Sequence, residues 1–270
     1  APLAAADEFD RFAERAEAGP AISHEAFDLF LERLALDGNG RTQVAYTAAA
    51  GEGERFLKAY ANGLAAISPA PLSADEQLAY WLNLRNALIV AEFCTRGGRG
   101  DLKKLRGDFA APGEAWTVKR VAVDGVELSI DDIERRIIFA NFNDPRVIYG
   151  LYQASASGPR LPRKAFAGET VIATLEKLGR DFIEDGVRVR KGAIEAPAVF
   201  EWYREALFDG SDDAVKSHLL GLSSAADRSK LEPASTLAYA KFRYQIEKYE
   251  VRTAAPVVSG PSQGAFPTGS

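Results

Sequence analysis

The segment from Leu78 to Cys94 constrains the fold of this chain most strongly, because a helix over it would be apolar on nearly every side. Such a helix has no face for solvent and has to be buried. The sequence also supplies its ends. Ser73 can cap the first turn while Glu76 reaches back to it, and Gly97-Gly98 follows as a stop. We therefore predict a buried helix that begins at Ser73.

Three polar side chains, Asn83, Arg85 and Asn86, interrupt this apolar helix. Asn83 and Asn86 are three residues apart and share a face, and buried amides need hydrogen-bond partners. Two interpretations are open: the amides tie the helix to neighbouring loops such as residues 150–158, or they line the floor of a pocket. Arg85 lies on another face, where an ion pair with Glu92 or a place at a pocket rim would explain it.

Further helices are predicted where apolar residues recur every three or four positions, and hairpins where they alternate around a turn. Asp124-Gly125 marks the clearest hairpin turn, and the apolar run at 144–153 favours a strand. A helix is expected to open at Ser129, with Asp132 in its first turn. The fold class predicted is α+β, a single domain of several helices around a small antiparallel sheet. The helices lie at 7–17, 24–36, 53–67, 169–184, 198–208 and 214–222, the hairpins at 116–129 and 187–197, and a last strand or helix at 239–251.

We expect three parts along the chain: an N-terminal arm with a short helix at 1–20, the α+β domain at 21–252, and a flexible tail at 253–270. The tail is rich in Gly, Pro and Ser, a composition typical of disorder. Small residues at the start would suit the mature end left by signal-peptide removal, so we expect a periplasmic or otherwise exported protein.

Composition excludes several functions. The net charge of −5 argues against a general nucleic-acid partner, and no apolar run reaches the roughly 20 residues of a membrane span. Cys94 is the only cysteine, so no intramolecular disulfide is possible and no Cys/His zinc site is predicted. Only His24 and His218 could serve as imidazole bases. We predict no metal and no cofactor.

Other polar residues also have two interpretations. Ser155 and Ser157 could replace a lost nucleophile, but a serine needs an adjacent base and neither histidine belongs to a motif that brings it there. The carboxylates at 131, 132 and 134 crowd one helix start, where acidic residues are favoured by the helix dipole alone. Residues 99–115, which hold two Arg-Gly-Asp triplets, are interpreted as a solvated loop.

Four short motifs stand in a fixed order: WLNLRN at 81–86, SIDDIER at 129–135, DPRVIYGLYQ at 144–153 and WYREALF at 202–208. In this order they resemble a bacterial and plant family known as domain of unknown function 547, over roughly residues 25–250. The resemblance implies an α+β fold related to papain-like or transglutaminase-like folds, and an exported protein. It implies no established reaction.

The chain departs from the family pattern at several positions. The pattern has His where this chain has Arg135 and Ile148, Cys where it has Gln153 and Gly158, and Tyr where it has Arg85. Glutamine is no nucleophile comparable to a thiolate, and arginine does not shuttle protons near neutral pH. The resemblance therefore implies that any Cys/His chemistry is lost. We expect Arg85, Arg135 and Gln153 together to convert a reactive site into an anion-binding one.

We expect a non-catalytic, exported binding protein that takes a small anionic ligand or a protein partner in a larger assembly. The alternatives are a hydrolase or acyl-transferase with a rebuilt active site, and a structural subunit of a complex. No catalytic residue is predicted. The candidate ligand-binding residues are Asn83, Arg85, Asn86, Asp132, Arg135, Arg146, Gln153, Ser155 and Ser157.

Overall fold

One long helix, α4 (Ala74–Thr95), runs through the interior of the computed structural model, which describes residues 7–37 and 40–249. Every residue from 76 to 91 is buried, as the apolar sequence predicts. The Ser73 hydroxyl accepts a hydrogen bond from the Glu76 N–H and caps the helix. The second half of the predicted capping box is wrong: the Glu76 carboxylate accepts from the N–H groups of Ile22 and Gly168 instead.

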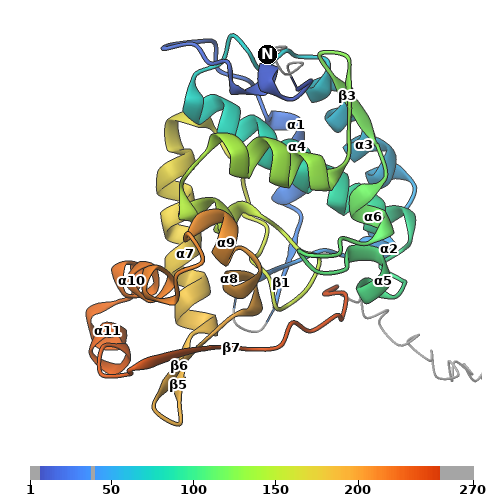
Figure 1. The fold of residues 1–270 in the computed structure, drawn as a ribbon. Helices are drawn as coiled ribbons and strands as arrows, with labels where there is room; N and C mark the ends of the chain where they lie inside the picture. Colours follow the sequence, from blue (N-terminus) through green and yellow to red (C-terminus); the bar gives the residue numbers. More distant parts are fainter. Residues whose placement is uncertain (1–6, 38–39, 250–270) are drawn as a thin grey trace, which may run out of the picture.

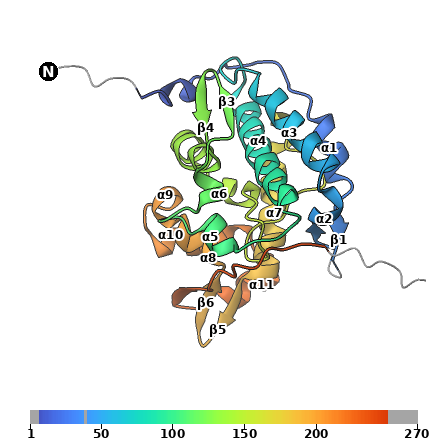
Figure 2. The ribbon, with the colours of Figure 1, turned by 90° about the vertical axis from the view of Figure 1, so that its right-hand side faces the viewer.

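Helices cover α4 on its several sides, and Figures 1 and 2 show them around it. The elements with the most extensive contacts to α4 are α2 (Tyr46–Ala49), α3 (Glu52–Ala65), the π-helix η2 (Asp132–Phe139), the 3-10 helix η4 (Gly168–Thr170) and α7 (Val171–Gly186). Two of them, α3 and α7, agree within about two residues with the helices predicted at 53–67 and 169–184.

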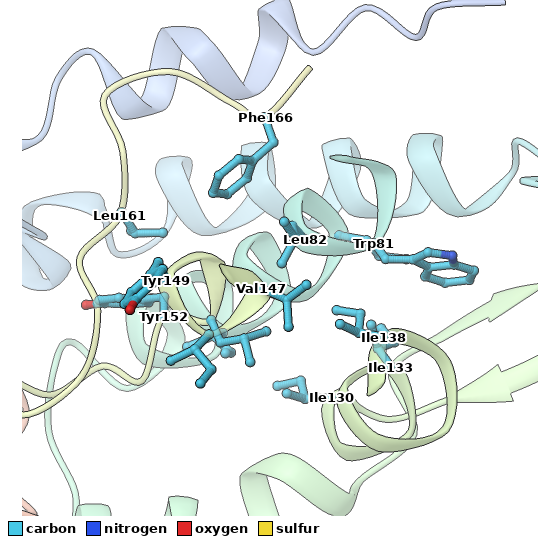
Figure 3. Packing of buried hydrophobic residues seen from close by; sticks show 14 of the residues in the cluster. Trp81, Leu82, Ile130, Ile133, Ile138, Val147, Tyr149, Tyr152, Leu161 and Phe166 are labelled. Atoms are coloured by element: carbon cyan, nitrogen blue, oxygen red, sulfur yellow. The ribbon is translucent and has the colours of Figure 1, made fainter. Parts of the chain in front are cut away.

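Tight packing fixes how these helices approach one another. A Cβ atom added at Gly150 would lie 2.9 Å from Leu82 of α4 and 3.1 Å from Leu175 of α7, so a larger residue would force these leucines to shift. Figure 3 shows Leu82 and Trp81 of α4 together with Ile133 and Ile138 of η2 in the same apolar cluster. The core is therefore built between helices, with the sheets at its margin.

The remaining helices and strands are short. The predicted helix at 7–17 is reduced to one 3-10 turn, and the segment at 99–115 contains two short helices where a loop was predicted. These elements are η1 (Asp10–Ala13), α1 (Glu25–Leu31), β1 (Ala35–Leu36), β2 (Thr42–Gln43), α5 (Leu102–Arg106), α6 (Glu114–Thr117), α8 (Ala198–Trp202), α9 (Arg204–Leu207), α10 (Asp212–Leu222) and α11 (Ala225–Leu231).

The hairpin of β3 (Val121–Val123) and β4 (Val126–Leu128) confirms its predicted turn. Asp124 and Gly125 have φ angles of 47° and 82°, the left-handed conformation that a two-residue hairpin turn of this kind requires. Val121 and Val123 on β3 and Val126 and Leu128 on β4 are buried while the residues between them are exposed, so one face packs on the core.

The apolar run at 144–153 is not a strand, which corrects that prediction. It forms the 3-10 helix η3 (Pro145–Gly150), because the Asp144 carboxylate accepts a hydrogen bond from the Arg146 N–H and Pro145 occupies the first turn. A short apolar run fits a buried strand and a buried helical turn equally well. Here the Asp144 cap favours the helical turn.

The largest sheet has the order β5-β6-β7 and is mixed. The hairpin of β5 (Arg188–Arg190) and β6 (Ala193–Ala196) is antiparallel as predicted, but β6 and β7 (Thr236–Tyr239) run parallel. Parallel neighbours need a long crossover, and α8 to α11 provide it. After β7 the chain continues as an extended segment (Figure 1, red). The α+β class is confirmed; the predicted tail at 253–270 lies outside the described residues.

Candidate functional site

A charged network lies inside the molecule, where two of the predicted site residues, Arg85 and Gln153, meet side chains from other parts of the chain. Arg85 Nη2 lies 2.6 Å from the Glu134 carboxylate, and Arg85 is fully buried. Arg106 approaches the same carboxylate at 3.8 Å and donates to the Gln153 side-chain oxygen at 2.8 Å. The expected partner of Arg85, Glu92, pairs with Arg96 and Arg120 instead. That prediction is wrong because η2 brings Glu134 to Arg85.

Aromatic side chains enclose the network. The Gln153 amide donates to the Tyr203 hydroxyl at 2.8 Å. The Arg106 guanidinium lies 5.0 Å from the centre of the Trp116 ring and 4.7 Å from that of Trp202, in cation–π contact with both. Arg106 belongs to one of the Arg-Gly-Asp triplets in the segment interpreted as a solvated loop, yet it is only 1% exposed. That interpretation is therefore wrong for this residue.

Two arginines and one carboxylate leave a buried surplus of one positive charge. Burial by itself would raise the pKa of Glu134, but Arg85 and Arg106 outweigh that effect and the pKa is lowered. None of the buried polar atoms of Arg85, Arg106, Glu134 or Gln153 lacks a hydrogen-bond partner in the described part of the chain. Glu134 thus supplies, from within the protein, the anion that Arg85 and Arg106 would otherwise take from a ligand.

The two asparagines of α4 tie the helix to loops. The Asn83 amide donates to the Phe166 carbonyl at 2.8 Å and accepts from the Phe166 N–H at 3.0 Å. The Asn86 amide donates to the Gly150 carbonyl and accepts from the Tyr152 N–H. Both amides are satisfied by backbone groups, so the structural interpretation accounts for them.

Three other predicted site residues have local partners. Asp132 accepts from the N–H and hydroxyl of Ser129, and its own N–H donates to the Ser129 hydroxyl at the start of the helix that contains η2. Arg135 pairs with Asp131 at 2.7 Å, away from the buried network. Arg146 forms ion pairs with Asp144 and Glu176. These contacts stabilise the ends of η2 and η3.

Ser155 and Ser157 hold a backbone segment that follows β7. The Ser155 hydroxyl donates to the Arg243 carbonyl at 2.7 Å, and the Arg243 N–H donates to the Ser157 hydroxyl at 2.9 Å. The two serines therefore clamp one residue from both of its backbone groups. Neither hydroxyl is hydrogen-bonded to a histidine anywhere in the described ranges.

The histidines and the cysteine are each engaged elsewhere. His24 Nδ1 is hydrogen-bonded to the Tyr60 hydroxyl, and His218 Nε2 to the Tyr149 hydroxyl at 2.8 Å. Burial lowers the pKa of His218 to about 4 and raises the pKa of the Cys94 thiol to about 12. At neutral pH the thiol is therefore protonated and a poor nucleophile. No cluster of three or more metal-ligating side chains occurs within 7–37 and 40–249.

A large cleft opens at the surface between α7, the loop of residues 156–164 and the segment after β7. Its volume is about 1350 Å³. Half-buried Leu178 and Phe182 of α7 line one wall together with Tyr149, and Figure 1 shows α7 descending to the sheet of β5, β6 and β7. Of the nine residues predicted to bind a ligand, Ser157 alone lines this cleft.

The cleft carries a surplus of positive charge. Eight cationic side chains and four carboxylates line it, on a chain whose net charge is −5. Lys177 pairs with Asp181, Arg190 with Glu195, Arg41 with Asp185, and Arg160 with Glu247. Within the described residues, four lining cations form no ion pair: Arg163, Lys164, Lys241 and Arg243.

Sequence reasoning missed most of the cleft. Its eight cations come from five separate places in the chain, at residues 41, 160–164, 177, 190 and 241–243, so no motif links them. The one usable signal was the cluster Arg160, Arg163 and Lys164 in a loop rich in small residues. None of the described helices is long and apolar enough to cross a membrane, which agrees with the prediction of no membrane span.

Comparison with known proteins gives one match, to a family model over the central part of the chain. No curated protein and no solved structure matches the chain. Residues 69–183, which run from the start of α4 to the last turns of α7, match the family model described as "Protein of unknown function, DUF547". This segment holds the buried carboxylate, Gln153 and the loop of residues 156–164. Over these residues, which make up less than half of its length, the chain is similar to the DUF547 family.

Proposed function

We propose that this protein is a non-catalytic binding protein that takes an anionic ligand in the cleft between α7, the loop of residues 156–164 and the segment after β7. The observation that carries the proposal is the set of four cations, Arg163, Lys164, Lys241 and Arg243, that line one cavity without an ion pair among the described residues. Cations grouped in a concave surface attract anions more strongly than the same charges spread over a convex one.

The overall charge of the chain makes this local feature informative. A protein with a net charge of −5 repels anions on average. The cleft is positively charged although the protein as a whole is negative. The four unpaired cations are exposed, so they reach solvent without a conformational change. An anionic ligand would replace water there without displacing a carboxylate of the protein.

The surroundings of the nucleophiles support binding over catalysis. The Ser157 hydroxyl at the cleft wall accepts a backbone N–H, and the only cysteine is buried with a raised pKa. Both histidines are hydrogen-bonded to tyrosines. A serine without an adjacent base and a protonated thiol are both weak nucleophiles.

Isothermal titration with citrate and with inorganic phosphate at low ionic strength tests the proposal. We expect citrate to bind, and its affinity to fall about fivefold in the double variant Lys241→Gln/Arg243→Gln, since each exposed charge contact contributes roughly 0.2–1 kcal/mol. The matched control is Lys103→Gln/Lys104→Gln, which removes two exposed charges from α5, outside the cleft. Equal loss of affinity in both variants, or no binding of either anion, would overturn the proposal.

A further inference from the structure

We infer that the anionic ligand of the cleft is an extended acidic segment of a polypeptide, in which acidic side chains alternate with apolar ones. This inference rests on the proposed function and narrows it to one class of ligand. The size of the cleft is the first argument. Its volume of about 1350 Å³ exceeds the roughly 300–1,000 Å³ typical of small-molecule pockets, so a single carboxylate or phosphate would fill little of it.

The unpaired cations lie at two separate places in the cleft. Arg163 and Lys164 stand at the end of the loop that lies against α1, where Arg163 donates to the Glu32 carbonyl and the Ala165 N–H donates to Asp28. Lys241 and Arg243 stand at the other end of the loop, where Ser157 holds Arg243. A ligand that uses both groups has to carry anionic groups at more than one point along its length.

An apolar wall lies along the same cleft. Leu178 and Phe182 are one turn apart on α7 and half-buried, so part of each side chain remains open to the cleft. In an extended peptide, successive side chains point to opposite sides. One row can therefore contact Leu178 and Phe182 while the other meets the cations. Residues 157–164 span at most about 25 Å, so a peptide of about eight residues would cover both cationic ends.

The protein holds the segment after β7 in place at residues 241–243, which carry two of the unpaired cations. Lys241 and Arg243 line the cleft, whereas Phe242 between them packs on Trp202 with ring centres 4.3 Å apart. The clamp of Ser155 and Ser157 fixes the backbone of Arg243. A cation on a fixed backbone loses less conformational entropy when it binds, which favours affinity. A nucleic acid would also satisfy the cations, but its backbone offers no apolar row for the wall of α7.

Fluorescence anisotropy with labelled eight-residue peptides tests the inference on the full chain. The probes are a peptide of alternating Glu and Leu, its Gln/Leu and Lys/Leu counterparts, a peptide of Glu and Ser that lacks the apolar row, and a single-stranded eight-nucleotide DNA. We expect the Glu/Leu peptide to bind at least about tenfold tighter than every other probe and than citrate. Lys241→Gln/Arg243→Gln should reduce that affinity more than Lys103→Gln/Lys104→Gln.

The outcomes separate the inference from the proposed function. If citrate binds in a Lys241/Arg243-dependent way and the Glu/Leu peptide binds no tighter than citrate, the peptide inference is wrong and anion binding stands. Tighter binding of the DNA than of the Glu/Leu peptide would overturn the inference in favour of a nucleic acid. If neither citrate nor any peptide binds, both fail.

The variant Phe182→Ser isolates the apolar wall, because Phe182 is half-buried at the cleft and carries no charge. We expect it to weaken the Glu/Leu peptide severalfold more than the Glu/Ser peptide, which has no apolar row, with circular dichroism confirming that the variant is folded. Unchanged peptide affinity in this folded variant would contradict the apolar contact.

Discussion

Arg85 and Glu134 form a buried ion pair that joins α4 to η2, with 2.6 Å between Nη2 and the carboxylate oxygen and neither side chain more than 2% exposed. Arg106 adds a second positive charge beside the same carboxylate. Isolated buried charges are strongly destabilising, so Glu134 is the group that makes two interior arginines tolerable. The network therefore stabilises the fold, and the candidate ligand site is the surface cleft.

Replacing Glu134 by Gln should destabilise the protein by about 3–5 kcal/mol, because it leaves Arg85 and Arg106 buried without a counter-charge. Chemical denaturation followed by circular dichroism measures the free energy of unfolding. Glu127→Gln is the control, since Glu127 is exposed on β4, and it should change stability by less than about 0.5 kcal/mol. Similar stabilities of the two variants would contradict the importance of this ion pair.

Removing the Ser157 hydroxyl should weaken ligand binding without removing any charge. The variant Ser157→Ala leaves the Arg243 N–H without its acceptor and loosens the position of the guanidinium. We expect a two- to fivefold loss of citrate affinity by titration calorimetry, on the order of 0.5–1 kcal/mol. Ser157→Thr keeps the hydroxyl and should restore most of the affinity. Equal losses in both variants would show that the hydrogen bond does not position Arg243.

His218 should make the protein less stable in acid. Burial first of all, and Arg146 in addition, lower its pKa to about 4, although Asp144 acts in the opposite direction. Because the folded pKa lies below the ordinary value of about 6.5, the unfolded chain binds more protons, and stability is lost as the pH falls from about 6.5 to 4.

The variant His218→Gln tests this dependence, because glutamine can still meet the Tyr149 hydroxyl but does not titrate. Between pH 7 and pH 5, the original protein should lose about 1–2 kcal/mol more unfolding free energy than the variant, as measured by urea denaturation at each pH. Parallel pH profiles would contradict the lowered pKa.

Cys94 should be unreactive in the folded protein. Burial raises the pKa of its thiol to about 12, with the charge of Glu54 contributing, and the side chain is fully buried. Labelling with a thiol-specific disulfide reagent at pH 8 should be at least about 100-fold slower than in denaturant. Rapid labelling of the native protein would contradict its burial.

Much of the fold could be predicted from local sequence signals. The all-round apolar character of residues 78–94 predicted a buried α4, and Asp124-Gly125 predicted the hairpin turn. Local sequence patterns did not predict the structure where the same pattern fits two kinds of element, or where the pairing depends on distant segments. The apolar run at 144–153 formed η3 because of the Asp144 cap, and the parallel pairing of β6 with β7 depends on a crossover that no local pattern reveals.

The candidate site was far less predictable. Arg106, Glu134 and Tyr203 are separated along the chain, and only folding brings them to Arg85 and Gln153. The residues of the cleft are also brought together only by folding, since Lys164 and Arg243 are almost 80 residues apart in the sequence. Periodicity shows which residues are buried, but not which buried polar groups meet. That pairing depends on tertiary contacts.

Amide chemical-shift mapping of the isotope-labelled protein during a citrate titration tests anion binding in the cleft most directly. The account predicts saturable shifts concentrated in residues 157–164 and 240–243, with the amides of Lys103 and Lys104 unaffected. Shifts spread evenly over the surface, or confined to residues outside the cleft, would contradict it.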